Sequence, residues 1–206
     1  MQNLFVGILI VNFNRRDDTL RCVASAYRSD YPCYEIVVVD NHSTDNSVEA
    51  LTSHYPGLTL LINDQNEGFT GGNNWGIQYL LDRGADYILL LNNDAVIAPN
   101  TLTEFVKHAE LHPEAGYFGA KVYTLESPRT ILTAGGFLKE NWVPTLRGLG
   151  EMDSGQYDQV CEVEYLSGSV LLVSRGAIQA VGMLDPDYYA YIEDIDWCFR
   201  GRQKGF

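Results

Sequence analysis

Four apolar segments, separated by stretches with helical spacing, constrain the fold of this chain more than any other feature. The first, LFVGILIVNF at residues 4–13, is apolar almost throughout, as expected for a strand covered on both faces. Three similar segments follow, YEIVVVD at 34–40, LTLLIND at 58–64 and YILLLNND at 87–94. Strands that alternate with helices predict βαβ units, so the expected fold class is α/β with a mostly parallel sheet flanked by helices.

The intervening segments carry helix signals. Apolar residues at i, i+3, i+4 and i+7 predict a helix over residues 20–27. Asn46 and Glu49 have the spacing of a capping box, which predicts a helix that begins near Asp45 and runs to about Tyr55.

Two further helices are expected before the fourth strand and after it. The segment NEGFTGGNNWG at 66–76 predicts an irregular loop, because glycines and amides are turn residues, and a helix should follow it and end at Gly84. A helix is expected over 99–112, with Pro99 in its first turn.

The second half of the chain is less regular. Strands are expected at 116–124, 131–139 and 163–175, whereas residues 140–159 have no periodicity and predict a mobile loop. A short helix is expected at 176–181, and a last helix at 193–204 that the chain end cuts off.

Length and charge exclude several function classes. The 206 residues are enough for one domain, and no apolar stretch approaches the roughly 20 residues of a membrane span. With 14 Lys and Arg against 27 Asp and Glu, charge alone would not hold the chain on nucleic acid or anionic lipid. The start of the sequence lacks the features of a signal peptide, and four scattered cysteines predict reduced thiols in a cytoplasm.

Polar residues gather where each predicted strand ends. They are Asn12 and Asn14 with Arg15 and Arg16, then Asp40 and Asn41, then residues 66–74, then Asn92, Asn93 and Asp94. Ligands of open α/β sheets bind outside the carboxyl ends of the strands, so one shared crevice is expected. Turn formation and helix capping are the alternative explanation of each cluster. The sequence lacks the dinucleotide fingerprint and the Walker A motif, which disfavours NAD or ATP as the ligand.

Five motifs in order carry a resemblance to a known family. LIVNFNR, VVVDNHSTDNS, NEGFTGGNNWGI, LLLNND and the segment from YLSGS to DWCFR resemble the second family of inverting glycosyltransferases, which has the GT-A fold, and most closely its rhamnosyltransferase-type branch. The resemblance implies one catalytic domain over 1–206, with a nucleotide-binding half at 1–115 and an acceptor and base half at 116–206. Family members continue past the point matching Phe206, with a strand and a His, so a C-terminally truncated domain is expected.

The resemblance also implies roles in binding a nucleoside diphosphate sugar. Asp40 would accept a hydrogen bond from the imide N–H of uracil or thymine. Asn12 and Asn14 would line the base and ribose, and Arg15 or Arg16 would approach the phosphates. Asn41, Gly71, Gly72 and Asn74 would contact the nucleotide, and Gly168 and Ser169 would flank the donor sugar.

Asn92, Asn93 and Asp94 match the metal motif of the family. Asp94 would hold Mg²⁺ or Mn²⁺ against the diphosphate, because hard cations take oxygen ligands and keep several waters. Asn92 stands where the family has its first acid, and would contact the ribose or the water shell of the metal.

The segment YIEDIDW is expected to supply the catalytic base. On a helix, Ile195, Cys198 and Phe199 form an apolar stripe, from which Glu193 points away while Asp194 lies beside it. Asp194 matches the general base of the family, which takes the proton of the acceptor hydroxyl. Asp196 has a structural explanation, since it is spaced to pair with Arg200.

The expected activity is transfer of a sugar, with rhamnose from dTDP-rhamnose favoured over a UDP-linked donor, to a saccharide or lipid-linked saccharide in polysaccharide synthesis. A cytoplasmic location is expected, with at most peripheral membrane contact. The alternatives are a glycosidase, which needs a second carboxyl group, a sugar-1-phosphate nucleotidyltransferase, and a non-catalytic binding module. The segment LDP at 184–186 replaces the FDE of the family. Trp75, Trp142 and Tyr188–Tyr191 could stack on sugars or pack in the core.

Overall fold

A six-stranded sheet forms the centre of the chain, whose computed structural model describes residues 4–206. In sheet order the strands are β3 (Thr59–Ile62), β2 (Tyr34–Asp40), β1 (Val6–Asn12), β4 (Tyr87–Leu91), β10 (Val170–Ser174) and β5 (Tyr117–Gly119). The first four are parallel, and β10 runs antiparallel to both β4 and β5. The predicted mostly parallel sheet is confirmed, and its strand order reverses direction between β1 and β4.

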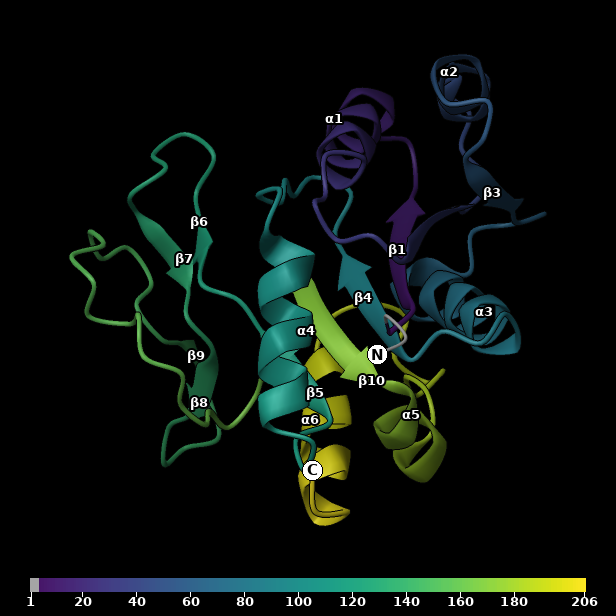
Figure 1. The fold of residues 1–206 in the computed structure, drawn as a ribbon. Helices are drawn as coiled ribbons and strands as arrows, with labels where there is room; N and C mark the ends of the chain where they lie inside the picture. Colours follow the sequence, from purple (N-terminus) through teal and green to yellow (C-terminus); the bar gives the residue numbers. More distant parts are fainter. Residues whose placement is uncertain (1–3) are drawn as a thin grey trace.

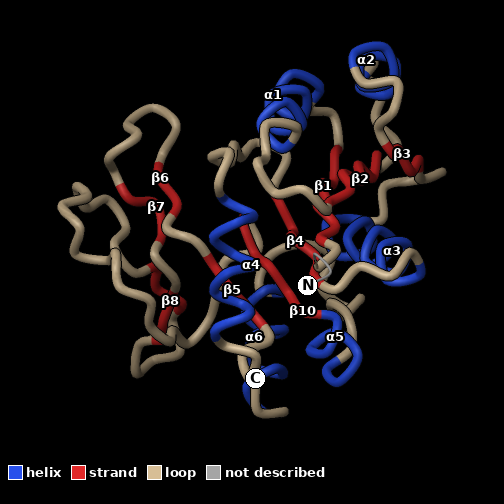
Figure 2. Tube along the Cα trace, in the orientation of Figure 1, coloured by secondary structure: helices blue, strands red, loops and turns tan. Residues whose placement is uncertain are grey.

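Helices cover both faces of this sheet (Figures 1 and 2). One face carries α1 (Arg16–Ala26), α2 (Ser47–His54) and α4 (Thr101–Leu111), and the other carries α3 (Gly68–Asp82), α5 (Arg175–Val181) and α6 (Glu193–Gln203). Alternate residues of β1 divide between the two cores: Ile8 packs with the first set of helices and Leu9 with the second. Burial on both faces explains why these strands are apolar without interruption. None of the described helices combines the length and apolar character that crossing a membrane requires.

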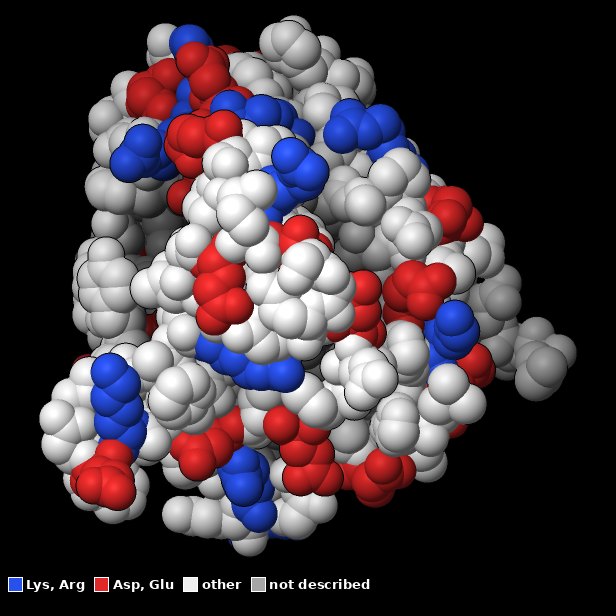
Figure 3. Space-filling view, turned by 90° about the vertical axis from the view of Figure 1, so that its left-hand side faces the viewer, with Lys and Arg blue, Asp and Glu red and all other residues white. Residues whose placement is uncertain are grey.

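Residues 120–165 form a lobe beside α4, beyond the edge strand β5 (Figure 1). It holds two antiparallel pairs, β6 (Val122–Tyr123) with β7 (Ile131–Thr133) and β8 (Gly136–Leu138) with β9 (Pro144–Leu146). Figure 3, viewed from the side of the lobe, shows Lys and Arg interspersed with Asp and Glu and with uncharged surface.

Three predictions for the residues of this lobe are wrong. The single strands expected at 116–124 and 131–139 are each divided in two, and Gly135, with φ of 98°, provides the bend between β7 and β8. The loop expected at 140–159 contains β9 and is tied down by Lys121, which pairs with Asp153 at 2.8 Å and Asp158 at 2.5 Å. Long-range pairing of this kind leaves no periodic signal in the sequence.

The irregular loop predicted at 66–76 is wrong, because helix α3 occupies most of this segment. It begins at Gly68 and contains Gly71, Gly72 and Asn74. Two of its glycines serve close packing on β1, since a Cβ at Gly76 would lie 2.2 Å from Leu9 Cδ1 and one at Gly72 would lie 2.8 Å from Val11 Cγ1. A helix that approaches a sheet this closely needs small residues, and those residues resemble a loop when read alone.

The ends of three helices also differ from the predictions. At the start of α2, Asn46 is left-handed and makes no side-chain cap, so the capping box is wrong. Helix α4 begins at Thr101, and the carbonyl of Pro99 accepts from the backbone N–H of Asp30 outside the helix. Helix α6 is not cut off by the chain end. It closes in a Schellman motif, in which the N–H of Phe206 donates to the carbonyl of Gly201 at 3.2 Å.

Asn74 joins α3 to the segment before α6. Its amide nitrogen donates to the carbonyl of Leu184 at 2.8 Å, and its amide oxygen accepts from the N–H of Leu184 at 3.1 Å. Leu184 is buried, so this pair of bonds satisfies both backbone polar groups of a residue that water does not reach. Both polar atoms of Asn74 are thereby engaged within the fold, and its contact with the nucleotide stays a prediction.

We expect Asn74→Ala to lower the free energy of unfolding by about 1–3 kcal/mol, because it leaves the buried backbone N–H and carbonyl of Leu184 without these partners. Urea unfolding followed by circular dichroism measures this. The matched control is Gln78→Ala on the same helix, whose amide bonds only the exposed Asp82. Loss of nucleotide binding at unchanged stability in Asn74→Ala would contradict the structural role.

Candidate nucleotide and base site

The side chain of Asn12 is the centre of a buried hydrogen-bond network at the end of β1. Its amide nitrogen donates to Asp40 Oδ2 at 2.7 Å and to Ser43 Oγ at 3.0 Å. Its amide oxygen accepts from Thr19 Oγ1 at 2.7 Å and from Asn93 Nδ2 at 3.3 Å. The network joins the ends of β1, β2 and β4, where strand order reverses and where open α/β sheets bind ligands.

Asp40 ends β2 with its carboxylate fully buried. Oδ2 accepts from Asn12, and Oδ1 accepts from the backbone N–H of Ser43 at 2.8 Å. Both oxygens therefore already hold a donor from the protein. A carboxylate has about four acceptor positions, so an imide N–H could add to these bonds only where the loop after β2 opens.

Asn41 is buried beside Asp40 and fixes the start of α3. Its amide nitrogen donates to the carbonyl of Gly68 at 2.7 Å, and its oxygen accepts from Asn63 Nδ2 at 2.5 Å. A Cβ at Gly72 would lie 2.9 Å from Asn41 Nδ2. The absent side chain of Gly72 therefore makes room for Asn41 and β1, which gives Gly72 a packing role; its approach to the nucleotide stays a prediction. The nearest atom to a Cβ at Gly71 is Glu67 Cβ, at 2.6 Å.

The loop between β1 and α1 carries the exposed members of the site. Asn14 has φ of 52°, and its side-chain oxygen accepts from the N–H of Thr44 at 2.7 Å, which joins this loop to the one after β2. Arg15 is largely exposed, and its guanidinium nitrogen Nη1 lies 3.7 Å from the carboxylate oxygen Oδ2 of Asp18. Arg16 donates to Asp17. A guanidinium in a surface pair of this kind can exchange its partner for a phosphate at little cost.

At the end of β4 the three residues of the NND segment face different surroundings. Asn93 is turned inward, where its amide nitrogen bonds Asn12 and Thr19. The carbonyl of Asn92 accepts from the Cys22 thiol at 3.4 Å, and burial raises the pKa of that thiol to about 12, so it is neutral. Asp94 is exposed and makes no hydrogen bond with residues 4–206.

The single carboxylate of Asp94 is suited to a magnesium or manganese ion whose other ligands are waters and substrate phosphates. Across the described part of the chain, no three His, Cys, Asp or Glu side chains are grouped to hold a metal. Mg²⁺ keeps several waters and is usually bound through one or two carboxylates together with substrate phosphates. One exposed carboxylate just after β4 is compatible with this chemistry, and Asn92 offers an amide oxygen nearby in the sequence.

Asp194 lies in the first turn of α6 and is oriented by two backbone groups. Its Oδ2 accepts from the N–H of Gly168 at 2.8 Å, and its Oδ1 accepts from the N–H of Ile195 at 2.8 Å. Ser169 follows Gly168, and its carbonyl accepts from the N–H of Asn92 at 2.9 Å. The candidate base and the metal motif therefore lie on adjoining segments, joined through Gly168 and Ser169.

The buried face of α6 differs from the predicted stripe. Trp197 is its centre: fully buried, it donates from Nε1 to the carbonyl of Gly182 at 2.8 Å. Cys198 is buried as predicted, whereas Ile195 and Phe199 are only half-buried. Glu193 shares the buried face, since it is 5% exposed, and its Oε2 has no hydrogen-bond partner. The expectation that Glu193 points away is wrong, because Trp197 and not Ile195 sets the inner face.

The structure thus brings together Asn12, Asp40, Asn92, Asn93, Gly168, Ser169 and Asp194 through direct contacts, with Asp94 and Asn14 exposed beside them. Two members escaped the sequence analysis. Ser43 is a hub that bonds Asn12, Asp40 and the backbone of Asn14, and it lies inside the VVVDNHSTDNS motif that could have indicated it. Thr19 lies in the charged segment RRDDTLR that begins α1, where nothing marks it out from its polar neighbours.

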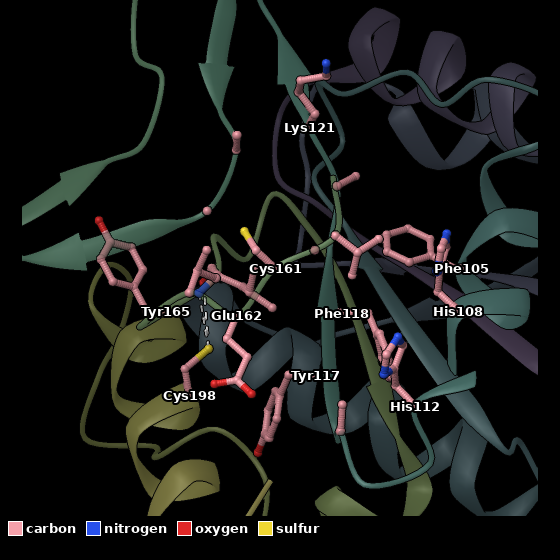
Figure 4. Close-up of a pocket in the computed structure, with 18 of the residues that line it drawn as sticks. Phe105, His108, His112, Tyr117, Phe118, Lys121, Cys161, Glu162, Tyr165 and Cys198 are labelled. Atoms are coloured by element: carbon pink, nitrogen blue, oxygen red, sulfur yellow. Dashed lines mark hydrogen bonds between the residues drawn. The ribbon is translucent and has the colours of Figure 1, made fainter. Parts of the chain in front are cut away.

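A large cavity lies away from this site. It has a volume of about 1010 Å³ and runs between α4, β5, residues 159–166 and the end of α6. Figure 4 shows Phe105, His108 and His112 on one side of it and Cys161, Tyr165 and Cys198 on the other. None of the predicted site residues lines it, so we place the site by its hydrogen-bond network and not by cavity size.

The family model described as glycosyl transferase family 2 matches residues 7–167, more than three quarters of the chain. The chain belongs to glycosyl transferase family 2. The match spans the Asn12 network, the NND segment and the segment up to Ser167, and it confirms the resemblance seen in the motifs.

Curated relatives are similar at modest identity. A low-salt glycan biosynthesis hexosyltransferase, Agl10 of Haloferax volcanii, is 27% identical over 205 residues, which cover 97% of this chain and 62% of the relative. An N-acetylglucosaminyl-diphospho-decaprenol L-rhamnosyltransferase of Mycobacterium tuberculosis is 27% identical over 183 residues, covering 78% of this chain and 58% of the relative. The chain therefore spans about three fifths of the length of these relatives.

A solved structure shows the same fold. The mannosyltransferase PcManGT of Pyrobaculum calidifontis, in complex with GDP-Man and Mn²⁺, superposes with a TM-score of 0.70 at 18% identity, over 100% of this chain and 54% of that one. This family member therefore has the predicted GT-A fold.

Glu193 predicts a pH effect on stability. Burial, with the charge of Asp194 adding to it, raises the pKa of Glu193 from its ordinary 4.5. Between that value and the raised one, the folded chain binds more protons than the unfolded chain, so the contribution of Glu193 to stability falls as pH rises through this window.

We expect Glu193→Gln to be more stable than the parent by about 1 kcal/mol near pH 7, with the difference shrinking toward pH 4, where the parent is protonated. Urea unfolding across that range measures it. The control is Glu162→Gln, at an exposed position, which should show no such trend. A difference that is independent of pH would show that Glu193 titrates as an ordinary surface carboxylate.

Proposed function

We propose that the chain is the catalytic domain of an inverting, metal-dependent glycosyltransferase. It transfers a sugar from a nucleoside diphosphate donor to a hydroxyl of a saccharide or lipid-linked saccharide, in the synthesis of cell-surface polysaccharide. The observation that carries this proposal is the junction of Asp194, Gly168, Ser169 and Asn92, which sets one oriented carboxylate beside the metal motif. The relatives and the structural neighbour named above support it.

Donor binding is assigned to the crevice at the carboxyl ends of β1, β2 and β4. The base and ribose would lie against Asn14 and the loop after β2, next to Asp40 and Asn41, with Arg15 or Arg16 near the phosphates. Rhamnose from a dTDP donor is favoured, because a relative carries the name L-rhamnosyltransferase and the motifs resemble that branch. A UDP-linked donor would present the same imide to Asp40.

Asp94, with Asn92 beside it, would hold Mg²⁺ or Mn²⁺. When bound there, the ion would neutralise the charge of the diphosphate leaving group, which then needs no acid to help it leave. The solved structure of PcManGT contains Mn²⁺ together with GDP-Man, which supports a divalent ion in the same role here.

Asp194 performs the proton transfer. Two backbone N–H groups fix its carboxylate, and the remaining lone pairs accept the proton of the acceptor hydroxyl as its oxygen attacks the anomeric carbon. A bond from that oxygen to the carbon forms while the bond to the diphosphate breaks. One displacement inverts the anomeric centre, and a single carboxylate is enough, which separates this chemistry from that of a glycosidase.

We expect dTDP or UDP with Mn²⁺ to raise the melting temperature by about 5 °C at a nucleotide concentration well above Kd, and Asp94→Ala to remove the metal-dependent part of this shift. Differential scanning fluorimetry with and without Mn²⁺ measures it. Asp82→Ala is the matched control, since Asp82 is exposed and precedes β4 whereas Asp94 follows it. If the metal-dependent shift of the melting temperature persists in Asp94→Ala, the ion binds at another site and not at Asp94.

We expect Asp194→Asn to lower kcat for transfer by about 10²–10⁴-fold while nucleotide binding is retained, because only the base is lost. The rate of transfer is measured as the release of nucleoside diphosphate from dTDP-rhamnose when an extract that contains the acceptor is added. Asp196→Asn is the control, because Asp196 pairs with Arg200 at 2.7 Å on the same helix. Equal activity of Asp194→Asn and the parent would favour another base or a binding module.

A further inference from the structure

Trp142 stands at the turn of the β8–β9 hairpin of the lobe, held out from the protein. The turn is closed by a bond from the N–H of Lys139 to the carbonyl of Val143 at 3.1 Å and one from the N–H of Trp142 to the carbonyl of Lys139 at 2.8 Å. Trp142 is 77% exposed and has φ of 62°, a conformation that bulky residues rarely adopt. Packing in the core, one of the two roles considered for this aromatic residue, is thereby excluded.

The indole borders a second cavity, of about 360 Å³, between the hairpin and α6. Its wall contains two aromatic rings, two carboxylates and two cationic side chains. These residues are Trp142, Phe199, Glu140, Glu164, Lys139 and Arg202, with Leu138 beside them. The two acids balance the two bases, so the cavity suits an uncharged ligand better than a phosphate or a nucleic acid.

Two contacts hold the cavity in shape and leave its polar groups open. The N–H of Leu138 donates to Glu164 Oε2 at 2.5 Å, and Arg202 donates through one guanidinium nitrogen to the carbonyl of Val163 at 3.3 Å. Glu164 keeps its other oxygen, and Arg202 keeps most of its five N–H donors. Aromatic faces combined with planar, multiply hydrogen-bonding side chains match the apolar faces and ring of hydroxyls of a sugar.

The cavity is connected to the candidate base along α6. Asp194, Cys198 and Arg202 follow one another at intervals of four residues, and they contact Gly168, Leu166 and Val163 in turn. Eight residues of helix separate Asp194 from Arg202, which is about 12 Å along the axis. A ligand in the cavity is therefore too far from the base to react, although both lie along the same helix.

We propose that this cavity is a saccharide subsite, which binds a sugar residue of the acceptor remote from the hydroxyl that reacts. The identification of this saccharide as the acceptor rests on the proposed function; the saccharide site itself rests on the cavity. Trp142 supplies the stacking face, and Arg202 and Glu164 supply the hydrogen bonds. Acceptors of two or more sugars would use it, whereas single sugars would not reach from the base.

Binding of the purified chain to an array of mono- and oligosaccharides tests this, with Trp142→Ala and the control Tyr27→Ala, an exposed aromatic residue at the end of α1. We expect the parent to retain glycans of two or more sugars, Trp142→Ala to bind them about tenfold more weakly, and Tyr27→Ala to bind as the parent does. Melting temperatures establish that all three are folded. A parent that retains no glycan, or equal retention by Trp142→Ala, overturns the subsite.

Nucleotide binding, measured on the same three proteins by thermal shift with dTDP and Mn²⁺, separates this proposal from the proposed function. It should be the same in all three, because Trp142 lies in the lobe and not in the crevice of the Asn12 network. Glycan binding that depends on Trp142, without any nucleotide shift in the parent, would support the saccharide site and overturn the transferase.

Discussion

The buried amide of Asn12 is the interaction on which the rest of the site depends. An unpaired amide in this position would cost free energy, and four partners from three other segments remove that cost. Each partner is fixed in turn, since Asp40 also holds Ser43 and Asn93 also bonds Thr19. Because the network is satisfied only when β1, β2, β4 and α1 are all in place, it sets the relative positions of the loops around the crevice.

The network divides the polar residues of the crevice into two layers. The inner layer, Asn12, Asp40 and Asn41, is fully buried and bonded within the protein. The outer layer, with Asn14 and Asp94, faces solvent with free or exchangeable groups. Inner residues therefore give the site its shape, and outer residues are the ones that a diphosphate or a metal meets first. Asp194 lies between, half-buried and oriented by backbone donors.

The strands and the polar residues that end them could be predicted from sequence, because a strand buried on both faces is a continuous apolar run whose end is marked by the first polar residue. Helix α3 could not, since the glycines that admit it to β1 are also the residues of loops. The buried face of α6 was misjudged for a different reason. Trp197 packs edge-on against Tyr117 of β5, a contact between residues 80 positions apart that no local stripe reveals.

The sequence by itself determined the α/β class, the order of the polar clusters and the motifs of the family, because period and residue type are local properties. Only the tertiary structure decided which polar groups form hydrogen bonds within the protein and which remain available to a ligand. Asn74 bonds the backbone of Leu184, and Asn93 bonds Asn12. Glu193 is buried, and its Oε2 has no hydrogen-bond partner. The side chains of Asp94 and Trp142, in contrast, are exposed to solvent. Hydrogen-bond satisfaction and burial depend on neighbours that are distant in sequence, and the folded chain alone brings those neighbours together.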